Sequence, residues 1–296
     1  MSLIGLEKVE KGNLKKALAN AFNSIGFIYP RNATDIVIKP NMCYYWDKTT
    51  GQTTDPDLVG SLIELLREKT SCGEIAIVES DASAMSCKYV FKYLGFEKLA
   101  SNLHVKLVNL SDDKTVPVSV RVGQHTFNFQ VPETIQKAQL RINIPKIKYT
   151  VKGIEITCAL KNIFGCNPYP KKFRLHPRLS EVIVALNKAM PFSLHVVDAN
   201  IVSGVQPRRL GLLMAGEDPV AIDAAAAKIA GLNPRKIEYL KIAEKEGLGR
   251  QEFFPKGSSL EYFRDRYPRK DMRKKLMSNA YSIAIKTGFG RRLGLE

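Results

Sequence analysis

Strand signals and helix signals alternate along most of this sequence, and this alternation is the strongest constraint on its fold. The β-branched runs 35–39 and 74–79 read as strands, and between them residues 58–66 place apolar side chains at helical spacing. Residues 103–109, which include His104, read as a further strand. Strand–helix–strand units join through right-handed crossovers, so their strands run parallel and their helices cover the sheet. We therefore predict an α/β fold with a mostly parallel sheet covered by helices.

The pattern changes between residues 116 and 131. Valines at alternate positions, followed by Phe127 and Phe129, flank Gly123-Gln124, and this arrangement predicts an inserted β-hairpin. The chain then returns to the earlier pattern, with strands expected at 139–144, 194–197 and 210–215 and helices at 180–190, 219–230 and 235–246. We predict one α/β domain over residues 1–255 and a basic helical C-terminal extension over residues 256–296 that packs on it.

The composition excludes a disordered chain and a membrane-spanning protein. Hydrophobic residues make up 45% of the 296 residues and are spread along the chain, which is enough to form a core. The longest mostly apolar stretches run about ten residues, short of the roughly 20 that cross a bilayer. Segment 1–17 contains no apolar core of signal-peptide length. We therefore expect a cytoplasmic protein.

The formal net charge of +16 is concentrated in two blocks. Residues 137–178 contain ten Lys/Arg and one acid, and residues 256–296 contain eleven Lys/Arg and four acids. These two blocks carry the whole excess, which favours anionic partners. A small anionic substrate is the first alternative, and nucleic acid bound by two basic surfaces is another.

The second block also carries aromatic residues. Tyr262, Phe263 and Tyr267 lie among its basic residues, where they could stack on bases or pack against the domain. Leu276 and Ile283 belong to a segment with helical spacing, so a basic amphipathic helix at an anionic membrane surface is a further alternative.

Lysines and acids gather where the predicted strands end. Lys39 and Asn41 close the first strand, Asp81 follows the second, Lys146 and Lys148 follow the strand at 139–144, and Asp198 ends the strand at 194–197. The carboxyl ends of parallel strands form the usual ligand crevice of an α/β sheet. The motif Leu160-Lys161-Asn162-Ile163-Phe164-Gly165, with His176 after it, falls within the first basic block. The sequence therefore predicts a polar site at this edge.

We assign roles within this site as hypotheses for an enzyme acting on a small phosphate or carboxylate compound. The residues expected to bind the substrate are Lys39, Asn41, Lys146, Lys148, Asn162 and His176, and those expected to be catalytic are Lys161, Asp198 and Asp218. Asp81, Asp198 and Asp218 could instead bind a divalent cation. Asp218 also precedes Pro219 as a helix N-cap, and Asp223 needs a partner if it is buried.

The chain resembles the uncharacterised family catalogued as domain of unknown function 362. The resemblance covers most of residues 35–250 and rests on a set of short motifs: Ile38-Lys39-Pro40-Asn41, Thr53-Thr54-Asp55-Pro56, Pro145-Lys146-Ile147-Lys148, Leu160 to Gly165 with His176, Val197-Asp198, and Ala215 to Asp223. The resemblance implies an α/β fold and a common polar site. The family is often described as associated with iron–sulphur proteins.

Five cysteines occur, and none lies in a C-x-x-C pair. Their odd number and the absence of an export signal favour reduced thiols. As a separate hypothesis, Cys158 and Cys166 flank Lys161-Asn162 and could hold an iron–sulphur cluster, with further ligands from Cys43 or Cys87. This would make the chain a redox protein.

Overall fold

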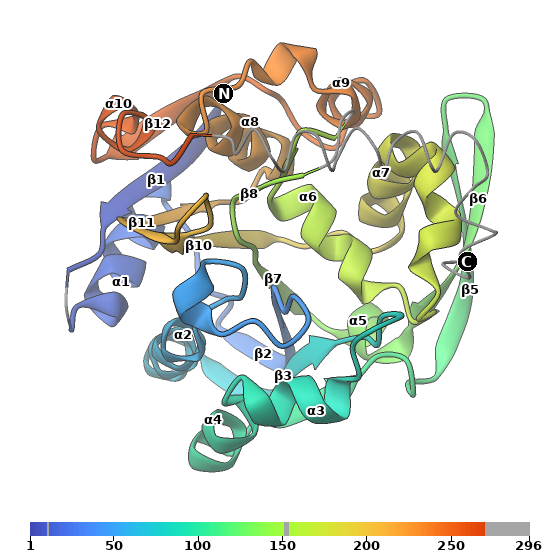
Figure 1. Ribbon diagram of the computed structural model, residues 1–296. Helices are drawn as coiled ribbons and strands as arrows, with labels where there is room; N and C mark the ends of the chain where they lie inside the picture. Colours follow the sequence, from blue (N-terminus) through green and yellow to red (C-terminus); the bar gives the residue numbers. More distant parts are fainter. Residues whose placement is uncertain (11, 151–153, 270–296) are drawn as a thin grey trace.

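The computed structural model describes residues 1–10, 12–150 and 154–269. Within these residues, eight strands form one sheet (Figure 1), in the spatial order β12 (Phe253–Gly257), β1 (Ser2–Lys8), β11 (Arg208–Gly216), β10 (Leu194–Val202), β7 (Leu140–Ile144), β2 (Asn32–Pro40), β3 (Ser71–Glu79) and β4 (Lys106–Asn109). β11 runs antiparallel to both of its neighbours, and the other pairs are parallel. The predicted α/β fold with a mostly parallel sheet is confirmed.

The central strands are apolar on both sides because helices cover both faces of the sheet. In β2, Ile36 and Ile38 enter one hydrophobic core while Val37 enters the other. The first core contains side chains from α1 (Leu14–Ile25), α2 (Pro56–Lys69), α3 (Cys87–Tyr93) and α4 (Phe96–Leu103). The second core contains side chains from α5 (Glu133–Lys137), α6 (Ala159–Asn162), α7 (Leu179–Ala189), α8 (Pro219–Ile229), α9 (Glu238–Lys245) and α10 (Leu260–Arg264).

The inserted hairpin consists of β5 (Thr115–Val122) and β6 (His125–Pro132), as the alternating pattern predicts. A smaller antiparallel pair, β8 (Lys148–Tyr149) and β9 (Ile156–Thr157), leads into α6. Four short 3-10 turns complete the described elements: η1 (Lys48–Thr50), η2 (Ile163–Cys166), η3 (Lys172–Arg178) and η4 (Pro234–Lys236).

One sequence expectation needs correction, and two strands of the main sheet have no counterpart in it. His104 does not lie in a strand: α4 continues to Leu103, and His104 ends it with a left-handed φ of 47°. The sequence pattern also gives no strand at β1 or β12, yet both belong to the main sheet. Of the predicted extension 256–296, the described part contains the end of β12 and the short helix α10, and residues 270–296 lie outside the described residues.

Candidate functional site

Two buried ion pairs lie at the carboxyl ends of the central strands. The Lys39 ammonium at the end of β2 is 2.7 Å from the Glu79 carboxylate at the end of β3, and neither side chain is more than 3% exposed. Lys146 follows β7, and its Nζ lies 3.1 Å from the carboxylate of Asp198 on β10, again with both side chains buried. Each of these two lysines is therefore neutralised inside the protein, as burial of a charge requires.

A network of buried amides fixes α6 onto these strand ends. Lys39, Asn143 and His195 are neighbours in register across β2, β7 and β10. The Asn143 side-chain NH₂ donates to the Ala159 carbonyl at 2.9 Å, and the Asn162 NH₂ donates to the Asn143 side-chain oxygen at 2.7 Å. These bonds hold both ends of the α6 turn and so determine where Lys161 lies.

Asp223 holds the same turn from α8. Its Oδ1 accepts a hydrogen bond from the Ala159 N–H at 2.6 Å, and its Oδ2 accepts one from the Tyr239 hydroxyl at 3.0 Å. Burial raises the pKa of Asp223 to about 7, despite these hydrogen bonds. The buried Asp223 carboxyl group therefore has two hydrogen-bond partners, the Tyr239 hydroxyl and the N–H at the start of α6.

Three further lysines gather at this edge, and we call Lys148, Lys161 and Lys172 the lysine site. Lys148 and Lys161 are half-buried and Lys172 is buried. Lys148 donates to the Gln52 carbonyl at 3.2 Å, whereas Lys172 donates to the Ser80 hydroxyl at 2.5 Å and the Asp81 carbonyl at 2.9 Å. Within the described part of the chain, none of the three forms an ion pair with a carboxylate.

The environment of the lysine site disfavours positive charge. Burial, followed by the charges of Lys148 and Lys172, lowers the pKa of Lys161 to about 7. Burial also lowers the pKa of Lys148 and that of Lys172. Such a cluster of cations would be stabilised by an anion that enters it.

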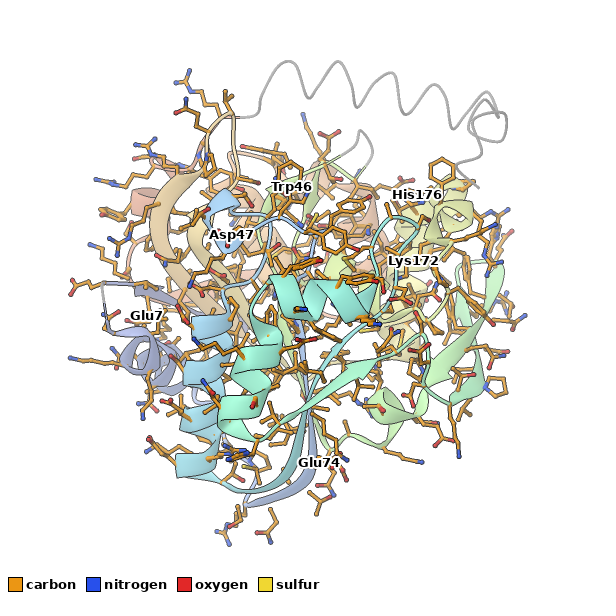
Figure 2. The ribbon with its side chains drawn as sticks, turned by 60° about the horizontal axis from the view of Figure 1, so that its bottom comes forward. Glu7, Trp46, Asp47, Glu74, Lys172 and His176 are labelled. Carbon is orange, nitrogen blue, oxygen red and sulfur yellow. The ribbon has the colours of Figure 1, made fainter. Side chains whose placement is uncertain are left out.

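His176 borders the lysine site. Its Nδ1 lies 3.0 Å from the Phe173 carbonyl, and its ring packs edge-on against Phe164 with centroids 5.9 Å apart. The Lys161 Nζ lies 3.9 Å from the centroid of the same Phe164 ring. Burial and the nearby Lys161 charge lower the pKa of His176. Figure 2 shows His176 and Lys172 near one another, far from Glu74 in β3.

The loop 41–55 borders the site from the side of β2. Asn41 N–H donates to the Thr54 hydroxyl at 2.8 Å, while the Asn41 side-chain oxygen is buried and has no hydrogen-bond partner within the described residues. Gly51 in this loop has a left-handed φ of 70°, and a Cβ there would lie 2.4 Å from the Ser203 N atom. Only glycine lets the loop approach the end of β10 so closely.

The three aspartates considered for a cation do not come together. Asp81 accepts from the Cys87 N–H at 2.7 Å and so caps α3. Asp218 caps α8, two residues past Gly216, which pairs with His195 at the start of β10. Asp198 lies three residues beyond His195 along β10, whereas Asp218 lies two residues beyond Gly216 toward the other end of the sheet. About five strand positions, roughly 16 Å, therefore separate Asp198 from Asp218.

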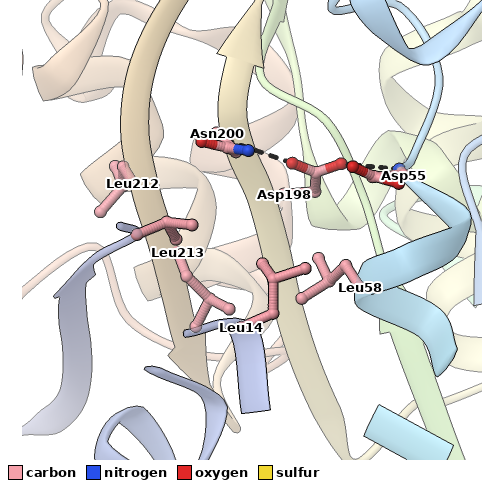
Figure 3. A pocket seen from close by; sticks show the side chains of 8 residues that line it. Leu14, Asp55, Leu58, Asp198, Asn200, Leu212 and Leu213 are labelled. Carbon is pink, nitrogen blue, oxygen red and sulfur yellow. Dashed lines mark hydrogen bonds between the residues drawn. The ribbon is translucent and has the colours of Figure 1, made fainter. Parts of the chain in front are cut away.

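Asp198 itself is held on all sides. Its carboxylate accepts from the Asp55 N–H at 2.9 Å and the Asn200 N–H at 3.2 Å, beside a small cavity whose lining includes four leucines (Figure 3). Together with the Lys146 ion pair, these bonds engage both oxygens of the Asp198 carboxylate. Among the residues that the structure describes, no group of three His, Cys, Asp or Glu side chains is arranged to hold a metal ion.

The cysteines do not fit an iron–sulphur cluster either. Cys158 lies beside Asp223 and Cys166 beside Lys39, and both thiols are buried. Among the described residues, neither cysteine belongs to a group of three His, Cys, Asp or Glu side chains that could hold a metal ion. The redox hypothesis therefore lacks a ligand set in the described residues.

Sequence reasoning missed Glu79, Lys172 and Asn143 as site residues. The signal for Glu79 is an acid at the end of the apolar run of β3. The signal for Lys172 is the basic run 171–174. The signal for Asn143 is weaker: a polar residue in an otherwise apolar strand end. Among the described lysines of the first basic block, four are buried or half-buried and two are exposed: Lys146, Lys148, Lys161 and Lys172 in the first group, Lys137 and Lys171 in the second.

Comparisons with known proteins extend these observations. The profile of a family described as "Domain of unknown function (DUF362)" matches residues 36–228. The thylakoid-associated protein sll1697 of Synechocystis sp. is 26% identical over 266 residues, which cover 84% of this chain and 79% of that protein. The structure of the lactate racemase apoprotein from Thermoanaerobacterium thermosaccharolyticum is similar with a TM-score of 0.43 and 11% identity, over 78% of this chain and 58% of that one. No helix in the described ranges has the length and apolarity needed to cross a bilayer.

Proposed function

This chain belongs to the DUF362 family, and we propose that it is an enzyme that acts on a small anionic compound at the lysine site. The observation that carries the proposal is the imbalance of charge. Of the five described lysines at this edge, only Lys39 and Lys146 have a carboxylate partner among the described residues. A carboxylate or phosphate group of the substrate would supply the missing negative charge to Lys148, Lys161 and Lys172. Asn41 and Asn162 border the same site.

The paired residues would have a different role from the one their sequence positions suggested. Lys39, Glu79, Lys146 and Asp198 are buried in pairs, so they would position the strand ends and would not contact the substrate. His176 would serve as a proton carrier next to Lys161. The five cysteines are unpaired, which supports the proposal that the enzyme works in the reducing environment of the cytoplasm.

Replacement of Lys148 by Gln tests the proposal. Calorimetric titration of the wild type with inorganic phosphate and with pyruvate should show saturable binding of at least one of them. Lys148→Gln should weaken that binding about 10- to 100-fold, since a hydrogen bond to a charged group contributes about 1.5–3 kcal/mol. The melting temperature should not fall, because the substitution removes a positive charge from a cluster of like charges.

Lys171→Gln is the matched control, since Lys171 is exposed beside the site and should leave the dissociation constant unchanged. Equal binding by wild type and Lys148→Gln would contradict the assignment. Stronger binding of RNA or DNA than of either small anion would favour the nucleic-acid alternative.

A second candidate function, contact with an anionic membrane surface, is supported by one exposed face. On α3, the exposed side chains are Lys88, Tyr89, Lys92 and Tyr93, without an acid among them. The Tyr45 ring packs against Tyr93 with centroids 5.9 Å apart. Aromatic rings mixed with lysines favour the interface of anionic bilayers. The relative from Synechocystis is named as thylakoid-associated, which agrees with this proposal.

We expect the wild type to float with vesicles of phosphatidylserine and phosphatidylcholine at low salt. The double substitution Lys88→Ser with Lys92→Ser should reduce vesicle affinity at least about tenfold, since each lysine near such a surface contributes about 1 kcal/mol. Lys241→Ser, an exposed lysine of α9, is the control. Vesicle binding that is absent, or that the double substitution leaves unchanged, would eliminate this candidate.

A further inference from the structure

Lys161 differs from the other four lysines at this edge in one respect. The ammonium groups of Lys39 and Lys146 donate to backbone carbonyls as well as to their carboxylates, at 2.7 Å and 2.8 Å. Lys148 and Lys172 also donate to backbone carbonyls. The Lys161 ammonium group forms no hydrogen bond within the described residues, and its Nζ lies over the face of the Phe164 ring. Four amines are thus anchored, and one is left available.

The surroundings of Lys161 favour the neutral amine. Burial and the positive charges of Lys148 and Lys172 lower the pKa of Lys161 to about 7, against about 10.4 for an ordinary lysine. At pH 7 the fraction of neutral amine is then about a thousandfold larger than in an exposed lysine. An amine that is desolvated beside other cations is a nucleophile for carbonyl carbon.

The adjacent groups suit the remaining steps of such chemistry. His176 packs on the same Phe164 ring and is close enough for the Lys161 charge to lower its pKa. An imidazole at that place can give a proton to a departing oxygen and accept one from the amine. Lys148 and Lys172 are near enough for their charges to lower the pKa of Lys161, and they would bind an anion there.

We propose that Lys161 forms an imine with a substrate that carries both a carbonyl group and an anionic group, the anion being held by Lys148 and Lys172. The inference rests on the proposed anion site. The Lys161 nitrogen forms a bond to the carbonyl carbon, and a proton passes from this nitrogen to the oxygen to give a carbinolamine. Protonated His176 gives the hydroxyl a second proton, the carbon–oxygen bond breaks, water leaves, and the protonated imine remains. No electron transfer to an outside group is needed.

Reductive trapping tests the inference directly. The wild type is incubated at pH 7 with pyruvate, which carries a carboxylate, or with glycolaldehyde phosphate, and with sodium cyanoborohydride. Intact mass should rise by the mass of the probe less one oxygen atom, and peptide mapping should place the label on Lys161. Labelling of Lys161 should exceed that of any other lysine at least about tenfold and should rise with a midpoint near pH 7. The more reactive probe identifies the anionic group.

Lys161→Arg keeps the positive charge and should abolish the label while phosphate or pyruvate still binds. Label spread over many lysines, or an unchanged yield in Lys161→Arg, would overturn the inference. An unlabelled wild type that still binds either anion by calorimetry would also overturn it and would leave the proposed function standing. If the wild type bound neither phosphate nor pyruvate saturably, both proposals would be contradicted.

Discussion

Replacement of Glu79 by Gln is expected to lower the free energy of unfolding by about 3–5 kcal/mol. The Glu79 carboxylate and the Lys39 ammonium are 2.7 Å apart and almost wholly buried, so the substitution leaves a buried positive charge without its partner. Gly165 packs against the same pair, and even a Cβ there would lie 3.0 Å from the Glu79 carboxylate. The site therefore has no room for a compensating rearrangement.

Urea unfolding followed by circular dichroism measures this effect. The double replacement Lys39→Met with Glu79→Leu removes both charges and should recover much of the lost stability. Glu68→Gln breaks the exposed pair with Lys15 and should leave the urea midpoint nearly unchanged. If Glu79→Gln were no less stable than Glu68→Gln, the buried pair would not contribute as the geometry indicates.

Asp223→Asn is expected to change how stability depends on pH. The pKa of Asp223 is raised from 3.8 to about 7, so between these values the folded protein keeps a proton that the unfolded chain releases. Wild-type stability therefore carries a contribution that is present at pH 4 and lost as pH rises through 7. Asparagine has no such titration and can still accept from the Ala159 N–H. Relative to wild type, the variant should gain about 2–4 kcal/mol between pH 4 and pH 8.

Paired unfolding curves at several pH values provide the measurement. The difference between variant and wild type cancels the contributions of Lys161 and His195, whose pKa values are lowered, provided that the substitution leaves them in place. Tyr239→Phe is a useful control, since it removes one hydrogen bond to Asp223 without removing the acid. A difference that stays constant from pH 4 to pH 8 would contradict the raised pKa.

Much of this fold can be predicted from sequence because the central strands are buried on both faces. That burial requires runs such as Ile36-Val37-Ile38 and Ile75-Ala76-Ile77-Val78, and these runs are visible without a structure. The two strands at the β12 side of the sheet are different. Within the described residues β12 is the edge strand and contains Pro255, and β1 beside it is interrupted by Gly5, so neither shows the pattern of a buried strand.

The positions of the site residues can be predicted from sequence only where the direction of the preceding strand can be predicted. Lys39, Lys146 and Lys148 follow parallel strands, and the rule that such ends share one edge applies to them. Asp218 follows β11, which runs in the opposite direction, and local sequence does not reveal that reversal. Pairing is hidden for a similar reason: whether Lys39 or Lys161 has a carboxylate partner depends on which distant strand end lies next to it.

The position of β1 in the sheet has a consequence for synthesis of the chain. β1 is synthesised before the other strands of the main sheet, but its neighbours are β11 and β12, which begin at Arg208 and Phe253. β2, β3 and β4 can pair while the nascent chain is still short. Ile4 and Leu6 of β1 can be buried in the sheet only after β11 has been synthesised. During that interval the N-terminal segment is an unpaired apolar strand, the kind of segment that associates with other nascent chains. A truncated chain that ends before β11 would keep β1 unpaired and would remain prone to association.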